Sequence, residues 1–129
     1  MKSFNHVDAK TVTEAVKLLK KNRGRAKLIA GGTDLLSTLK DKILPAYPET
    51  VINIKTIPNL NHISEDVSGL KIGALAKLEE IALSPVVQEK YKLLAEAAEA
   101  VATPQIRRMG TIGGNLCQDV RCWYYRYPH

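Results

Sequence analysis

Residues 28–36 read LIAGGTDLL, with two adjacent glycines and a Thr-Asp pair between two apolar runs. As local structure this is a strand-to-helix turn, because glycine tolerates positive φ and Thr33 or Asp34 can cap the next helix. As a ligand site, the same turn would offer unpaired backbone N–H groups to phosphate oxygens. One glycine pair does not decide between the two interpretations, so the neighbouring sequence has to.

The sequence before the turn predicts an amphipathic helix within residues 7–24. Thr11 and Glu14 have the spacing of a capping box at its start, and Gly24 suits its end. Its apolar stripe, spaced i, i+3, i+4 and i+7, consists of Val12, Ala15, Val16 and Leu19.

The turn joins a short buried strand over residues 27–30 to a helix over residues 33–43, which Pro45 and Pro48 interrupt. Residues 49–57 alternate in polarity and are rich in β-branched side chains, which predicts another strand. This part of the chain therefore predicts a β-α-β-α-β unit with parallel strands.

A different pattern follows Pro58, and we place a subdomain boundary there. Residues 1–57 would form an N-terminal βαβ-type subdomain, and residues 58–129 the start of a second, incomplete α+β subdomain. Residues 61–74 predict a β-hairpin with its turn at Asp66 to Gly69.

Two helices are predicted after the hairpin, a short one over residues 77–85 and a longer one over residues 84–102. In the longer helix, Ser84 is the expected N-cap and Pro85 the first helical residue, and Thr103-Pro104 ends it. Its expected buried face consists of Leu93, Leu94, Ala97, Ala98 and Val101.

Composition and charge limit the classes of protein to consider. The 129 residues are 45% apolar, and no apolar run reaches membrane-spanning length, so we expect no membrane partner. The N-terminus lacks the apolar region of a secretory signal, and two cysteines imply no disulfide framework, which predicts a cytoplasmic protein. The net charge of +6 is concentrated near the N-terminus without aromatic residues between the lysines. We therefore expect a solvated helix surface there and no nucleic-acid partner, with DNA binding left as a third hypothesis.

A second glycine-rich stretch, TPQIRRMGTIGGNLCQ, follows the longer helix. Gly110, Gly113 and Gly114 lie within five residues, and Thr111 and Asn115 add hydrogen-bonding side chains. Two such turns, one in each subdomain, would hold a diphosphate between two facing nests of backbone N–H groups. The chain has no P-loop lysine and no G-x-G-x-x-G at these turns, which disfavours a nucleoside triphosphatase and a Rossmann dinucleotide site.

Taken together, these motifs resemble the FAD-binding subunit of molybdenum hydroxylases. The resemblance rests on F-x-x-V-x-A-K-T-V-x-E-A, AGGTDLL, IGALAKLEEI and ATPQIRRMGTIGGNL, which keep their order from Phe4 to Leu116. The family includes xanthine dehydrogenase, carbon monoxide dehydrogenase and 4-hydroxybenzoyl-CoA reductase. It implies an α+β, two-subdomain FAD-binding fold of the vanillyl-alcohol oxidase and p-cresol methylhydroxylase type, here truncated.

The resemblance implies FAD as the cofactor and no catalytic side chain in this chain. The first turn would wrap the FAD diphosphate with Leu28, Ile29, Ala30, Gly31, Gly32, Thr33, Asp34 and Leu35. The opposing loop would consist of Gly110, Thr111, Gly114 and Asn115. Val101 and Ala102 would approach the flavin or its ribityl chain, and Cys117 would lie near the adenosine half.

The implied function is that of an oxidoreductase subunit that relays electrons between iron–sulfur clusters and an external acceptor or donor. The implied partners are a molybdopterin-binding large subunit and a [2Fe-2S] small subunit, with a homo-oligomer left open. The alternative is an FAD-free fragment that serves assembly, with its aromatic C-terminus docked on a partner.

The end of the chain is the part that departs from most of the family. Four of the seven aromatic residues lie among its last seven residues, which predicts burial against something beyond this chain, and hence a piece of a longer flavoprotein or one product of a split gene. LCQDVRCWYYR is most similar to the 4-hydroxybenzoyl-CoA reductase branch, which implies Cys122 as an iron–sulfur ligand in a longer parent. Because the chain has only two cysteines, we expect free thiols and no metal here. A zinc site from Cys117, Cys122 and His129 is left as an alternative.

Overall fold

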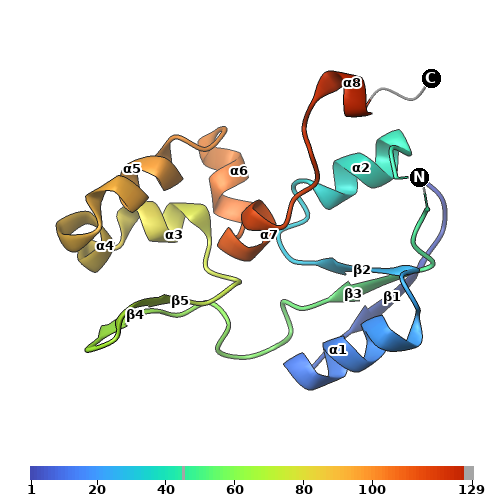
Figure 1. The fold of residues 1–129 in the computed structure, drawn as a ribbon, viewed down its shortest axis with the longest axis horizontal. Helices are drawn as coiled ribbons and strands as arrows, with labels where there is room; N and C mark the ends of the chain where they lie inside the picture. Colours follow the sequence, from blue (N-terminus) through green and yellow to red (C-terminus); the bar gives the residue numbers. More distant parts are fainter. Residues whose placement is uncertain (45, 127–129) are drawn as a thin grey trace. The chain divides into compact units, whose positions relative to one another are not determined.

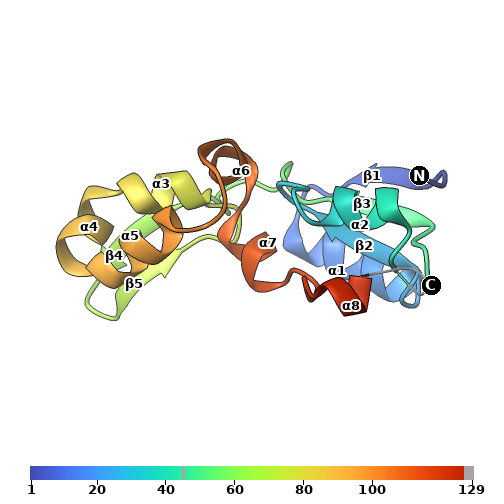
Figure 2. The same cartoon turned by 90° about the horizontal axis from the view of Figure 1, so that it is seen from above.

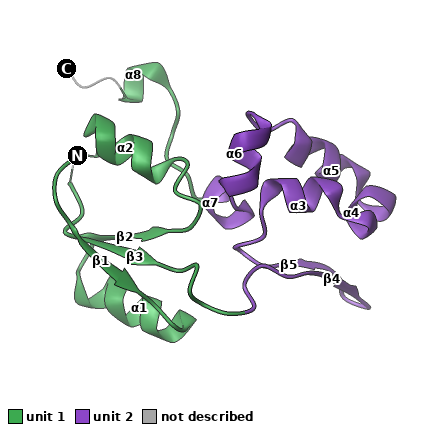
Figure 3. Cartoon of the chain, turned by 180° about the vertical axis from the view of Figure 1, so that it is seen from behind, with its two compact units in different colours: residues 1–58, 117–129 green, residues 59–116 purple. Residues whose placement is uncertain are grey.

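The computed structural model describes residues 1–44 and 46–126, which form two compact units. Unit 1 contains residues 1–58 and the segment from Cys117 onward, and unit 2 contains residues 59–116 (Figure 3). Both helices and strands occur in each unit, so the chain has the mixed helix-and-sheet character that the sequence predicted.

The limits of the units differ in one respect from the predicted subdomains. The boundary after Pro58 lies one residue from the expected boundary after Ile57. The segment from Cys117 onward was placed in the second subdomain but groups with unit 1. The physical reason is a pair of ion pairs, because Arg121 and Arg126 both contact the Asp34 carboxylate of unit 1.

Unit 1 is built on a three-stranded parallel sheet with the strand order β1-β3-β2. Its elements are β1 (Asn5–Asp8), α1 (Val12–Lys21), β2 (Ala26–Ile29), α2 (Leu35–Asp41), β3 (Thr50–Asn53) and, after the return from unit 2, α8 (Trp123–Arg126). The predicted β-α-β-α-β order and the parallel pairing are therefore confirmed. The central strand β3 is buried along its whole length.

The two helices between the strands lie on opposite faces of the sheet (Figures 1 and 2). The connection from β1 to β2 crosses the sheet in one direction, and the connection from β2 to β3 returns in the other. Right-handed crossovers in opposite directions place their helices on opposite faces. Helix α8 lies near α2, and residues of both line one surface pocket.

Helix α1 begins as predicted but buries only part of the predicted apolar stripe. The Thr11 hydroxyl accepts from the Glu14 N–H at 3.1 Å, while the Glu14 carboxylate accepts from the Lys10 N–H at 2.7 Å instead of from the cap residue itself. Val12 and Val16 of the predicted stripe are 53% and 42% exposed, and Ala15 is buried. A sheet of three strands covers only a narrow strip of a helix, so part of the apolar stripe stays in solvent.

Two further predictions about unit 1 were wrong in detail. Helix α2 ends at Asp41, where Lys42 takes a left-handed conformation with φ of 57°, so it stops before the prolines. Pro45 itself lies outside the described residues. Strand β2 was predicted to be buried, but Leu28 is 41% exposed because β2 is an edge strand of the sheet.

Unit 2 places a β-hairpin against a group of short helices (Figure 1). Its elements are β4 (Ile63–Asp66), β5 (Gly69–Ile72), α3 (Leu78–Leu83), α4 (Pro85–Lys90), α5 (Lys92–Glu99), α6 (Pro104–Met109) and α7 (Ile112–Leu116). The predicted hairpin is confirmed, with Asp66 opposite Gly69 at its turn. Its core consists of Ala76, Ile81, Ala82, Val87, Ala95 and Ala98.

The longer helix predicted for this region is two helices. The chain breaks at Tyr91, which has φ of −130° and ψ of 46° between α4 and α5. The Tyr91 hydroxyl donates to Glu65 Oε1 at 2.9 Å, which ties the break to strand β4. Leu93 and Ala97 of the predicted buried face are therefore exposed, because the helix after the break buries the face that carries Ala95 and Ala98.

Candidate functional site

Residues 30–34, AGGTD, form the loop between β2 and α2, which we call the first loop. It leaves the sheet at the carboxyl end of β2, the edge where parallel α/β sheets bind their ligands. Gly32 has φ of +74°, and a Cβ placed there would lie 3.2 Å from the Leu36 side chain. The loop therefore requires glycine at this position for its backbone conformation.

The backbone N–H groups of the first loop are the feature that distinguishes it. Among the hydrogen bonds between described residues, none is donated by the N–H groups of residues 30–35. The next turn is ordinary helix, since Leu36 N–H donates to Gly32 O at 3.0 Å and Thr38 N–H donates to Asp34 O at 3.1 Å. Six consecutive N–H groups on half-buried residues are thus available to an acceptor from outside the loop.

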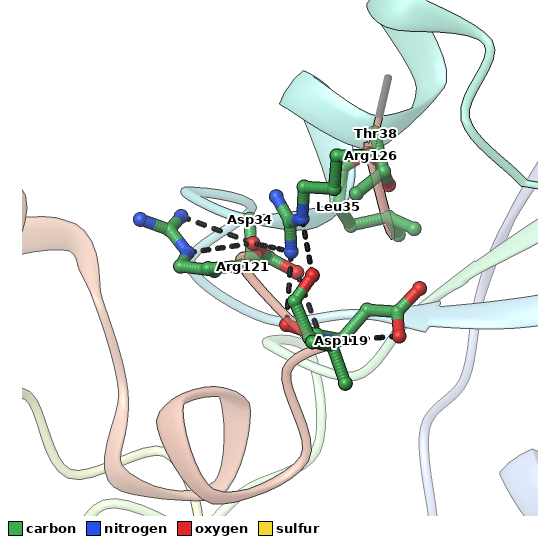
Figure 4. Close-up of polar contacts among 7 residues, drawn as sticks. Asp34, Leu35, Thr38, Asp119, Arg121 and Arg126 are labelled. Atoms are coloured by element: carbon green, nitrogen blue, oxygen red, sulfur yellow. Dashed lines mark hydrogen bonds and ion pairs between the residues drawn. The ribbon is translucent and has the colours of Figure 1, made fainter. Parts of the chain in front are cut away.

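Asp34 occupies the N-cap position of α2, but its side chain does not bond to the helix. Its Oδ1 accepts from Arg121 Nε at 3.1 Å, from Arg121 Nη2 at 3.0 Å and from Arg126 Nη2 at 2.9 Å (Figure 4). Its Oδ2 accepts from the Asp119 N–H at 3.3 Å. The expectation that the Asp34 side chain caps the helix was wrong, because the carboxylate is engaged by two arginines of the C-terminal segment.

The pKa of Asp34 reflects these contacts. Burial of the carboxyl group raises its pKa, but hydrogen bonds from Arg126, Arg121 and the Asp119 N–H outweigh burial and hold the pKa below the ordinary value. Asp34 is therefore ionised at neutral pH. Its negative charge faces two guanidinium groups, which offset it.

The second glycine-rich stretch is not the open loop that the sequence predicted. We call residues 110–115 the second segment; most of it is the start of α7. Five of its six N–H groups donate to acceptors within unit 2, which are Ile106 O, Ala76 O, Ala74 O, Thr111 Oγ1 and Thr111 O. The glycine-rich sequence forms a closed helical turn here, because α6, the loop between β5 and α3, and Thr111 itself supply acceptors for its N–H groups.

The glycine and threonine of the second segment have structural roles in unit 2. Thr111 is 5% exposed, and its hydroxyl accepts from the Gly114 N–H at 3.2 Å, so it caps α7. A Cβ on Gly113 would lie 2.8 Å from Ala74 O, which leaves no room for a side chain. Close backbone packing is what requires glycine at position 113.

The other predicted site residues lie at separate places in the two units. Val101 is half-buried, and its carbonyl accepts from Arg107 Nη1 at 3.0 Å. Ala102 is exposed and has a left-handed φ of 46°. Cys117 and Cys122 are exposed free thiols of unit 1. The structure thus brings Leu28 through Leu35 together in one unit, and the residues from Val101 through Asn115 together in the other.

Sequence reasoning missed Arg121 and Arg126 as parts of the site. Their side chains contact a residue 87 and 92 positions earlier in the chain. The available signal was a pair of arginines next to a tail rich in aromatic residues, with few acids nearby to pair with them.

Within residues 1–44 and 46–126, no group of three or more His, Cys, Asp or Glu side chains could hold a metal ion. His129, a member of the alternative zinc site, lies outside the described residues. None of the described helices is long and apolar enough to span a membrane.

Comparisons with known proteins agree with one another. Residues 2–121 match the family described as the FAD-binding domain in molybdopterin dehydrogenase. The carbon monoxide dehydrogenase medium chain of Hydrogenophaga pseudoflava is 44% identical over 113 residues, which cover 88% of this chain and 39% of the relative. The nicotinate dehydrogenase FAD-subunit of Eubacterium barkeri is 38% identical over 117 residues, which cover 90% of this chain and 39% of the relative.

A solved structure has the same fold. The carbon monoxide dehydrogenase of Hydrogenophaga pseudoflava, in a form that lacks the Mo-pyranopterin moiety, superposes with a TM-score of 0.84 at 43% sequence identity. The match covers 89% of this chain and 39% of that one. The chain therefore spans about two fifths of the length of the relatives that it matches.

Proposed function

The chain belongs to the family of FAD-binding domains of molybdopterin dehydrogenases, and from this premise we propose that its first loop binds the diphosphate of FAD. The resemblance drawn from the motifs and the prediction of FAD as the cofactor of the family are confirmed. The similarity of the tail to the 4-hydroxybenzoyl-CoA reductase branch stays a prediction.

The observation that carries the proposal is the row of six N–H groups, from Ala30 to Leu35, without acceptors among the described residues. A diphosphate is a dianion that needs several donors at close range, and backbone N–H groups supply them without a metal. Gly31 and Gly32 carry no side chain that would keep phosphate oxygens away from these N–H groups. The residues present therefore fit the group.

The second segment would contribute differently. Five of its six N–H groups already donate within unit 2. We therefore propose that it contacts FAD through the glycine backbone at Gly110 and Gly114 and through the polar residues Thr111 and Asn115. In the same proposal, Leu28 and Ile29 support the first loop, Val101 and Ala102 approach the flavin or its ribityl chain, and Cys117 lies near the adenosine half. The complete fold would then be of the vanillyl-alcohol oxidase and p-cresol methylhydroxylase type.

We propose that the whole protein is a subunit of a molybdenum-containing oxidoreductase. When bound, the isoalloxazine ring supplies the redox chemistry, and the protein supplies position and polarity. Its partners would be a molybdopterin-binding large subunit and a [2Fe-2S] small subunit, and it would relay electrons between iron–sulfur clusters and an external acceptor or donor. Two exposed free thiols suit the reducing cytoplasm.

The test compares Gly31→Asp with Gly31→Asn in the full-length protein. The two side chains have the same shape, and Gly31 does not have the positive φ that would confound a change at Gly32. Aspartate would place a carboxylate against the diphosphate, so we expect Gly31→Asp to bind FAD at least about tenfold more weakly than Gly31→Asn. Flavin absorbance after gentle purification, and FAD titration of the apoprotein, measure this. Equal flavin content in the two variants would contradict the diphosphate assignment.

The second candidate function is an assembly fragment that does not bind FAD. It is favoured by the exposure of the aromatic residues of α8, since Trp123, Tyr124 and Tyr125 are 85%, 92% and 54% exposed. Large apolar side chains exposed next to one another indicate a contact surface. Native mass spectrometry with flavin stoichiometry separates the two functions, because a colourless, tightly associated complex would favour the second.

A further inference from the structure

The contacts of Asp34 with Arg121 and Arg126, which we call the Asp34 clamp, have a consequence for the first loop. Arg126 is the less exposed member, with a side chain 15% exposed, and it also donates to Asp119 O at 2.9 Å. Arg121 is 56% exposed and presents two nitrogens to the same carboxylate oxygen. The clamp thus holds the carboxylate in one place with charge-assisted hydrogen bonds, which are the strongest kind available to a side chain.

An aspartate at the N-cap position normally accepts a hydrogen bond from an N–H of the first helical turn. In this chain that turn continues directly from the first loop, whose N–H groups are the proposed diphosphate ligands. Without the two arginines, the Asp34 carboxylate would be an unpaired anion within its own anion site. As an unpaired negative charge beside the first loop, it would repel the diphosphate.

We propose that Arg121 and Arg126 are positioning residues that hold the Asp34 carboxylate away from the N–H groups of the first loop and keep the loop open to the FAD diphosphate. The inference rests on the proposed function. It assigns a role to two arginines of the C-terminal segment that the sequence analysis did not include among the site residues. The arginines act through Asp34 rather than by touching the cofactor.

The experiment measures the FAD dissociation constant of the apoprotein, as the full-length chain in its complex, for three variants. Arg121→Gln/Arg126→Gln releases Asp34, and we expect FAD to bind about tenfold more weakly. Adding Asp34→Ala removes the repelling carboxylate, so the triple variant should bind within about threefold of the wild type. Asp34→Ala alone should bind FAD at least as tightly as the wild type, because it leaves two unpaired guanidiniums beside the loop.

These outcomes separate the inference from a purely mechanical role of the clamp. If the clamp only fastens the C-terminal segment, Asp34→Ala alone weakens FAD binding and the triple variant does not recover; either result overturns the inference. Arg25→Gln is the matched control, since it breaks the Arg25–Glu49 ion pair of 2.9 Å elsewhere in unit 1 and should leave FAD affinity unchanged. If the double arginine variant fails to fold by circular dichroism, the single Asp34→Ala variant still decides the matter.

Gly31→Asp in the same series distinguishes the two proposals. If Gly31→Asp impairs FAD binding while the double arginine variant binds normally, only the inference about the clamp is overturned. If neither change affects FAD binding, the proposed function itself has failed.

Discussion

The first loop and the second segment have similar sequences and opposite backbone states. Each has a glycine pair with a threonine and an Asp or Asn nearby. In the first loop no N–H group of residues 30–35 donates to another described residue, whereas in the second segment five of six donate within unit 2. In the first, glycine provides a positive φ at Gly32; in the second, it lets Gly113 lie against Ala74 O. A glycine pair alone therefore does not identify an anion site; the availability of its N–H groups does.

We expect the largest effect on FAD affinity when a negative charge is placed in each of the two stretches. Gly31→Asp relative to Gly31→Asn should cost at least about tenfold in FAD affinity, while Gly114→Asp relative to Gly114→Asn should cost clearly less. The reason is that only the first loop has N–H groups left for phosphate. FAD titration of the four variants measures both ratios. A larger ratio at Gly114 would show that the second segment dominates phosphate binding.

Gly113→Ala should affect stability more than cofactor affinity. Its Cβ would lie 2.8 Å from Ala74 O and 3.0 Å from Ala74 Cβ. We expect a loss of about 2 kcal/mol in the free energy of unfolding, as for overpacked cores. Chemical denaturation of the full-length protein, followed by circular dichroism, measures it. A stability equal to that of the wild type would mean that α7 moves freely from the Ala74 backbone, contrary to the closed turn described above.

Thr111→Val tests the cap that closes the second segment. The substitution keeps the shape of the buried side chain but removes the acceptor of the Gly114 N–H. We expect a loss of about 1 kcal/mol in the free energy of unfolding. Thr111→Ser keeps the hydroxyl and is the control. A loss in Thr111→Val no larger than the loss in Thr111→Ser would show that the hydroxyl does not stabilise the second segment.

The smallest expected effect is on the acid dependence of stability. Because the folded-state pKa of Asp34 is lowered, its ionised form stabilises the fold fully above the ordinary pKa of 3.8, and this contribution is lost as the pH falls through the lower folded value. In the Asp34→Asn variant, the melting temperature should therefore fall less as the pH is lowered into the acid range. An unchanged fall in the melting temperature would mean that the arginine contacts do not persist in solution.

The sequence predicted the fold of unit 1 well because its signals are local. The Gly-Gly turn between apolar runs, the capping spacing of Thr11 and Glu14, and the β-branched run before Ile57 each specify an element from neighbouring residues. The hairpin turn at Asp66 to Gly69 is equally local. Where a break depended on a distant contact, the prediction was wrong, as at Tyr91, whose hydroxyl bonds to Glu65 on another element.

For the site, the sequence by itself determined the chemistry: glycines and small polar residues in two stretches, in an order that identifies an FAD-binding family. Only the tertiary structure decided which N–H groups are available. Two of the five acceptors that close the second segment, Ala76 O and Ala74 O, lie more than thirty positions away, and the arginines that hold Asp34 come from residues 121 and 126. Hydrogen bonds between residues so far apart leave no periodic or local pattern, so the folded chain alone reveals them.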